Sequence, residues 1–104
     1  MDMFSAVADP TRRAMLDLLV ERERTVSDLA KAFPTISQPA VSKHLRVLRN
    51  AGLVSVRAHA QQRIYRLQPK ALAELDAWIA KYKVFWSGHL DALEQYLSKK
   101  EKEE

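Results

Sequence analysis

The fold is decided by the stretch Ser37-Gln-Pro-Ala-Val-Ser-Lys-His-Leu-Arg-Val-Leu-Arg-Asn-Ala-Gly-Leu-Val54. The serine at its start can cap a helix, and the proline is tolerated in the first turn that follows. Val41, Leu45 and Leu48 then recur at the spacing of one helical face, which predicts a buried stripe. Gly52 can adopt the left-handed conformation that ends a helix. We therefore expect a helix here with an apolar inner side and a basic outer side.

Two further helices are predicted ahead of this stretch. The first begins at Asp9-Pro10, a capping carboxylate followed by the proline that suits the first helical position. The second is capped by Thr25 or Ser27, and Pro34 ends it. The connection between this second helix and the next is short, which is typical of a helix-turn-helix.

After Gly52 the apolar pattern changes to a period of two. Residues 53–58 and 63–67 predict two strands, and the polar residues 59–62 predict the loop of a β-hairpin. Pro69 opens a final helix whose apolar residues recur every three or four positions as far as Leu97. The predicted fold is therefore mainly α with a small β-hairpin. The final helix is longer than a small core needs, so we expect part of it to bind another chain.

The middle of the chain carries only one sign of charge. From Leu29 to Ala73 there is no Asp or Glu, while the rest of the chain holds nine cations and thirteen carboxylates. Because a polyanion is attracted to one surface and not to a total charge, this asymmetry favours a nucleic-acid partner. The eight cations of the stretch are Lys31, Lys43, Arg46, Arg49, Arg57, Arg63, Arg66 and Lys70.

The composition excludes several classes of protein. A chain of 104 residues has room for one domain, and its 47% hydrophobic residues suffice for a core. There is no cysteine, so disulfides and thiolate metal sites are excluded. The sequence has no secretory leader pattern and no 18-residue apolar run, so we expect a cytoplasmic protein without membrane contact. Without a glycine-rich phosphate loop or a Ser, His and carboxylate set, we expect neither an enzyme nor a cofactor.

Short helices followed by a hairpin predict a helix-turn-helix with a wing that binds double-stranded DNA. Polar and basic side chains on the outer side of the third helix are expected to meet base edges and phosphates, and Arg57 and Arg63 are expected to grip the minor groove or flanking phosphates. The alternatives are a solvated basic helix face, a solvated turn and, for His44, a side chain that holds a neighbour. The predicted DNA-binding residues are Ser37, Gln38, Ser42, Lys43, His44, Arg46, Arg49, Arg57, Gln62 and Arg63.

The aromatic stripe of the final helix, which includes Tyr82, has two interpretations. It could line a ligand pocket, but at helical spacing it is more typical of a core and a dimer interface. The predicted dimer-interface residues are Phe4, Trp78, Phe85, Trp86, Leu90, Leu93 and Leu97.

Two motifs resemble those of the ArsR/SmtB family of bacterial winged-helix repressors. They are Asp9-Pro-Thr-Arg-Arg13 and the run from Val41-Ser-Lys-His-Leu45 to Ala51-Gly-Leu-Val54. The resemblance covers nearly the whole chain and implies a homodimer in the bacterial cytosol, at the nucleoid, joined through its first and last helices. Such a dimer binds an inverted repeat over a promoter and blocks transcription, in some members that of its own gene. The implied organisation is one domain over residues 1–98, with a recognition helix at 37–51, a wing at 53–68 and a dimerisation helix at 70–98, then a charged tail at 99–104.

Many members of this family release DNA on binding metal, and the sequence departs from both common site types. The thiolate site needs cysteines. For the site on the last helix, Asp76 and His89 stand at the separation of the two leading ligand positions, but Trp78 and Ala92 occupy the second and fourth positions. Two ligands of four would coordinate zinc poorly. The chain therefore resembles the metal-independent subgroup, and no metal site is predicted.

Three functions follow from these observations. The leading one is a sequence-specific DNA-binding transcriptional repressor, with repression itself implied by the resemblance. The alternatives are a sensor repressor that responds to a ligand or a metal, and a winged-helix module that binds another protein without DNA. The stretch from Leu29 to Ala73, called here the acid-free stretch, carries lysines and arginines but no carboxylate. It argues against the protein-binding module, because protein interfaces are depleted in lysine. The sequence does not identify a small-molecule inducer.

Overall fold

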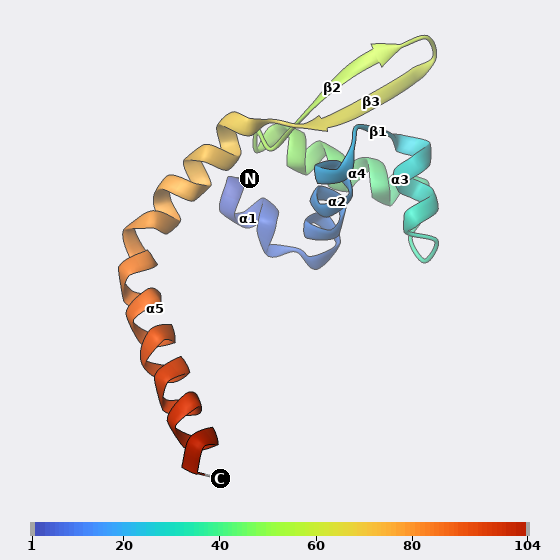
Figure 1. Cartoon of the computed structure of the whole chain (residues 1–104). Coiled ribbons are helices and arrows are strands. Elements are labelled where there is room, and N and C mark those ends of the chain that lie inside the picture. Colours follow the sequence, from blue (N-terminus) through green and yellow to red (C-terminus); the bar gives the residue numbers. More distant parts are fainter. Residues whose placement is uncertain (1, 104) are drawn as a thin grey trace. The chain divides into compact units, whose positions relative to one another are not determined.

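The computed structural model of the chain describes residues 2–103, with side chains described as far as Lys100. It divides into two compact units, Met1–Leu72 and Ala73–Glu104. The first unit contains most of the elements, and α5 begins within it and forms the second unit (Figure 1). The elements are α1 (Met3–Ala8), α2 (Pro10–Glu21), β1 (Arg24–Thr25), α3 (Val26–Ala32), α4 (Gln38–Asn50), β2 (Val54–His59), β3 (Gln62–Leu67) and α5 (Pro69–Glu103).

The core of the first unit forms around one face of α4. Val41, Leu45 and Leu48 are completely buried, which confirms the stripe predicted from their spacing. Met15 of α2 and Leu29 of α3 are buried against them in the same cluster. Because both neighbouring helices pack on this one face, the opposite face of α4 stays exposed.

The ends of α4 lie where the sequence predicts them. The Ser37 hydroxyl accepts a hydrogen bond from the backbone N–H of Ala40 at 3.2 Å and caps the helix start. Gly52 has φ of +80°, the left-handed conformation that ends a helix and that glycine adopts at little cost. The helix-turn-helix that α3 and α4 form therefore has both ends of its second helix fixed by local chemistry.

The Asp9-Pro-Thr-Arg-Arg13 motif joins α1 to α2. The Asp9 carboxylate accepts a hydrogen bond from the backbone N–H of Arg12 at 2.9 Å and caps α2. The guanidinium groups of Arg12 and Arg13 donate to the last four carbonyls of α1, which have no partner within their own helix. These carbonyls belong to Ser5 and Ala6 for Arg12, at 3.2 and 2.7 Å, and to Val7 and Ala8 for Arg13, at 3.0 and 3.2 Å. The motif therefore has a structural role: it forms the α1–α2 joint, in which it caps the start of α2 and binds the end of α1.

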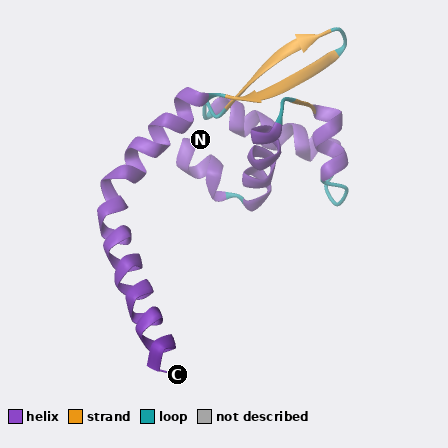
Figure 2. Ribbon diagram, in the orientation of Figure 1, coloured by secondary structure: helices purple, strands orange, loops and turns teal. Residues whose placement is uncertain are grey.

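A third strand, β1, extends the predicted hairpin into a three-stranded antiparallel sheet with the order β1-β3-β2 (Figure 2). In β1, Arg24 pairs with Tyr65 and Thr25 pairs with Ile64. This strand cannot be predicted from the sequence, because two residues are too few to show an alternating pattern. Thr25 also caps α3 in a reciprocal capping box with Asp28, so the cap predicted at Thr25 or Ser27 is the former.

The remaining boundaries differ from the predictions in two places. The loop predicted over residues 59–62 is shorter, because His59 and Gln62 pair in register and the turn comprises Ala60, at φ +56°, and Gln61. Helix α5 continues as far as Glu103, through the segment that the sequence assigns to a charged tail. Within the described residues, no helix combines the length and the apolar character that a membrane span requires.

Replacing Asp9 with alanine tests the α1–α2 joint. The hydrogen bond from the Arg12 N–H, helped by the charges of Arg12 and His44, lowers the pKa of Asp9 below its usual 3.8. A lowered folded-state pKa contributes stability above the unfolded pKa and loses it as pH falls through the folded value. We expect Asp9→Ala to lower the free energy of unfolding in urea by about 1 kcal/mol at pH 7.

Asp9→Asn is the matched control, since it keeps an oxygen acceptor but cannot titrate. It should lose less stability than Asp9→Ala at pH 7, and its stability should fall less than that of the wild type below pH 4. Equal stability of Asp9→Ala and the wild type at pH 7 would contradict the capping role.

Candidate nucleic-acid interface

The exposed face of α4 carries the side chains that the sequence assigns to DNA. Gln38, Lys43, Arg46 and Arg49 are exposed, and Ser42 is partly buried. They lie opposite the stripe that packs in the core, so the burial of one face presents the other to solvent. Short polar side chains lie near the start of the helix and cations follow, an arrangement that suits insertion into a major groove.

Some cationic side chains form hydrogen bonds or ion pairs within the protein, and others do not. Arg12, Arg13 and Arg24 donate to backbone carbonyls, and Arg66 donates to the Ser55 hydroxyl at 3.1 Å. By contrast, four cations on α4 and the hairpin make no hydrogen bond or ion pair with any other described residue. These are Lys43, Arg46, Arg49 and Arg63. A guanidinium or ammonium group without an internal partner is available for phosphates and base edges.

His44 contacts the protein's own α2. Its Nδ1 lies 3.4 Å from Nη1 of Arg12, and the residue is partly buried. This contact favours the interpretation that His44 holds a neighbour, because it links α4 to the arginine that binds the end of α1. Its assignment to DNA stays a prediction.

The strand register separates the two arginines expected to act together at the hairpin tip. Arg57 pairs with Ile64, and Arg63 pairs with Ala58. Because paired residues share a face of the sheet and successive residues alternate, Arg57 and Arg63 lie on opposite faces. Their assignment to DNA stays a prediction, in which the two side chains reach the duplex from opposite faces of the hairpin. Arg63 shares its face with Tyr65, which is buried in the core, so it lies on the side of the hairpin that packs on the helices.

Arg57 is already bound to a carboxylate. Its Nη2 lies 2.8 Å from Oε2 of Glu23, and both side chains are about half exposed. The hydrogen bond from Arg57, with the charges of Arg57 and Arg66, lowers the pKa of Glu23. Glu23 stands just before β1, so pairing of β1 with β3 brings a carboxylate to a wing that has none in its own sequence. Because Glu23 lies outside residues 29–73, the absence of carboxylates from that stretch does not reveal this contact.

Two hollows in the first unit bring predicted residues together. Arg49, Arg57 and Arg63 line one with Val56 and Ala58, between α4 and the hairpin. Arg63 also lines a second with Gln38, Ser42 and Gln62, close to the start of α3. The turn end of the hairpin extends beyond the helices (Figure 1). The recognition helix and the wing thus converge around Arg63.

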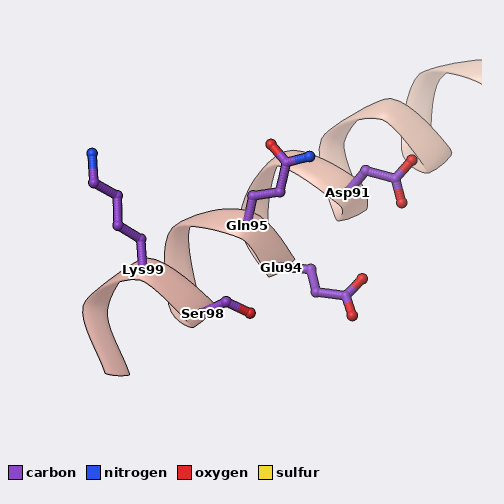
Figure 3. A pocket seen from close by; sticks show the side chains of 5 residues that line it. All are labelled: Asp91, Glu94, Gln95, Ser98 and Lys99. Atoms are coloured by element: carbon purple, nitrogen blue, oxygen red, sulfur yellow. The ribbon is translucent and has the colours of Figure 1, made fainter. Parts of the chain in front are cut away.

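The second unit presents a different surface. Along α5, apolar side chains are exposed, among them Phe85 at 67%, Leu93 at 52% and Tyr96 at 62%. A shallow hollow lined by Asp91, Glu94, Gln95, Ser98 and Lys99 consists of side chains from this one helix (Figure 3). It is an open helix surface and not an enclosed ligand site. Across the described part of the chain, no three His, Asp or Glu side chains lie close enough together to hold a metal ion.

Comparison with known proteins agrees with this geometry. The family model described as "Bacterial regulatory protein, arsR family" matches residues 9–56. The chain is 38% identical over 94 residues to the HTH-type transcriptional regulator Rv2034 of Mycobacterium tuberculosis, covering 90% of this chain and 84% of that protein. It is 36% identical over 81 residues to the transcriptional repressor SdpR of Bacillus subtilis, covering 78% and 89%. A crystal structure titled "Possible transcriptional regulator for arsenical resistance" superposes with a TM-score of 0.73 at 44% identity, covering 80% of this chain and 85% of that one.

The fold and its exposed basic helix define a winged helix-turn-helix DNA-binding regulator, as the sequence predicts. More particularly, the chain belongs to the ArsR family of bacterial regulatory proteins. It is a transcriptional regulator and not an enzyme. The individual DNA-binding residues stay predictions; among their cations, Lys43, Arg46, Arg49 and Arg63 have no side-chain partner within the described part of the chain and Arg57 is paired with Glu23.

The Glu23–Arg57 ion pair predicts the effect of a substitution outside the acid-free stretch. Glu23→Gln removes the carboxylate that competes with DNA phosphate for Arg57. We expect tighter DNA binding and a slope of log affinity against log salt that is steeper by about 0.9, the value for one added phosphate contact. Fluorescence anisotropy with a labelled duplex at several salt concentrations measures both quantities.

The double variant Glu23→Gln/Arg57→Ala is the control, because it removes the cation that Glu23→Gln releases. The gain in affinity should disappear in the double variant. A gain that persists without Arg57 would show that Glu23 acts through the general field of the protein and not through this ion pair.

Proposed function

We propose that this protein is a homodimeric transcriptional repressor that binds an inverted repeat in promoter DNA. The observation that carries the proposal is the set of four partner-free cations, Lys43, Arg46, Arg49 and Arg63, gathered on α4 and the hairpin. The other elements of the first unit pack against one another and against α4 and the hairpin. A relative over most of the chain, SdpR, bears the name of a repressor, which supports repression over activation.

In this proposal α4 enters the major groove and the hairpin reaches the flanking backbone. Gln38 and Ser42 lie in the first turns of α4, the part of a recognition helix that meets base edges. Lys43 and Arg46 bind guanine edges or phosphates, and Arg63 binds a phosphate from the wing. Sequence preference then comes from α4, while the wing supplies affinity.

The exposed apolar face of α5 supports a second copy of the chain as the partner. Trp78, Trp86, Leu90, Leu93 and Leu97 are between 41% and 58% exposed, and Leu90, Leu93 and Leu97 line one continuous hollow. Monomeric proteins rarely expose an apolar surface of this kind. A symmetric dimer presents α4 twice, which matches an inverted repeat with half-sites one helical turn or a multiple apart. Phe4 of α1, which is 41% exposed, stays a predicted interface residue.

The proposal includes a site of action and a mode of regulation. The protein acts on the nucleoid in the bacterial cytosol, and the promoter of its own gene is the first operator to test. Trp78 and Ala92 stand where the metal-sensing members carry ligands, so we place the chain in the metal-independent subgroup. Calorimetric titration with zinc tests that placement, and tight stoichiometric binding would contradict it.

The deciding experiment compares the upstream region of the gene with a scrambled duplex of the same composition. Binding is measured at several salt concentrations, because phosphate contacts make all DNA affinities depend on salt. Specific recognition predicts an affinity for the upstream duplex at least about a thousandfold higher than for the scrambled one. Equal affinities would contradict a sequence-specific regulator of that promoter.

Arg63→Ala tests the wing contact. Loss of one phosphate contact should weaken binding to upstream and scrambled duplexes by the same factor and reduce the salt slope by about 1. Lys81→Ala on the second unit removes the same charge outside the proposed interface and is the control. A slope that falls equally in both variants would mean that only net charge matters.

Leu93→Asp tests the dimer. A carboxylate within the apolar stripe opposes burial, so sedimentation at micromolar concentration should show a folded monomer with reduced DNA affinity. Val84→Asp is the control, because Val84 is 80% exposed and lies nine residues from Leu93, about 180° around the helix. A dimer that survives Leu93→Asp would exclude this face as the interface.

A further inference from the structure

A polar hollow of about 320 Å³ lies where three elements of the first unit meet. It is lined by residues 25–27 at the start of α3, by Gln38 and Ser42 of α4, and by residues 61–63 at the turn end of the hairpin. These segments are far apart in the sequence, and Ser27 and Gln61 are among the lining residues that the sequence does not assign to DNA. The fold alone brings them to one place.

The chemistry of the lining suits an anion that carries several acceptor oxygens. Hydroxyl groups come from Ser27 and Ser42, amides from Gln38, Gln61 and Gln62, and a guanidinium from Arg63; no carboxylate lines the hollow. The side chains of Ser27, Gln61 and Arg63 make no hydrogen bond with another described residue, so their donors are available. Hydroxyl, amide and guanidinium groups are the side chains that bind DNA phosphates.

The position of the hollow indicates which part of DNA would fill it. Gln38 and Ser42 belong to the start of α4, which in the proposed function enters the major groove. In the proposed function, a DNA strand that borders this groove would pass between the start of α4 and the hairpin. The space available there is the hollow, which is open at the surface and has donors on three sides.

We propose that this hollow seats the sugar–phosphate backbone at the edge of the major groove, with Ser27 and Gln61 as phosphate-binding residues. The inference rests on the proposed function and adds two contacts to it. Both are neutral donors, so they fix the register of α4 on the duplex without carrying sequence information. Because neutral donors replace no counterion, they also leave the salt dependence unchanged.

The experiment uses the full-length protein and a duplex that the wild type selects from a random pool, with a scrambled duplex for comparison. Ser27→Ala and Gln61→Ala should each lower the affinity for both duplexes by the same factor, up to about tenfold, with unchanged salt slopes. Ser27→Glu should lower both affinities further, since its carboxylate would face phosphate. An acidic residue in the first turn of α3 favours the helix, so Ser27→Glu should fold normally.

Gln95→Glu, which adds the same charge in the second unit at an exposed position outside the hollow lined by Leu90, Leu93 and Leu97, is the control. Three results would overturn the assignment: Ser27→Glu binding as tightly as Gln95→Glu, a loss in Gln61→Ala confined to the selected duplex, or a changed salt slope in either alanine variant. The second result would mean that the hollow contacts base edges. If the wild type itself selects no duplex, the proposed function fails, which is a distinct result.

Discussion

The rest of the first unit depends on the burial of one face of α4. Val41, Leu45 and Leu48 are completely buried against α2 and α3, and this packing fixes how α4 is rotated about its axis. The rotation determines which side chains reach solvent, so the same apolar stripe that stabilises the domain also presents Lys43 and Arg46. A polar substitution in the stripe would therefore affect the DNA-binding surface through folding, since removing a buried leucine costs about 2–5 kcal/mol.

Whether a cation of this protein is available to DNA depends on its contacts within the protein more than on the number of charges. Arg12 and Arg13 belong to a basic motif, yet they bind the end of α1 and help the domain to fold. Arg57 lies in the acid-free stretch, yet it binds Glu23. Lys43, Arg46, Arg49 and Arg63 have no side-chain partner among the described residues, and Arg49 and Arg63 line a hollow between α4 and the hairpin. A guanidinium that satisfies a helix end is not available to a phosphate, because its donors are already used.

The second unit is a helix whose apolar side chains have no cover within its own fold. Its stripe from Trp78 to Leu97 recurs with helical spacing, and its members are at least about two-fifths exposed. Such a surface gains free energy when it is removed from water, at about 25 cal/mol per Å². The cover proposed above is a second copy, because twofold symmetry would then also pair the two copies of α4.

The sequence by itself determined the local features: the caps at Asp9 and Ser37, the stop at Gly52, the buried stripe of α4, the hairpin and the long final helix. Each feature depends on residues within one or two helical turns or on a periodic pattern, so each can be predicted from the sequence. Only the tertiary structure decided the pairing of β1, the Glu23–Arg57 ion pair, the opposite faces of Arg57 and Arg63, and the hollow that joins Ser27 to Gln61. These arise from pairing and packing between distant segments, for which residue order supplies no periodic signal.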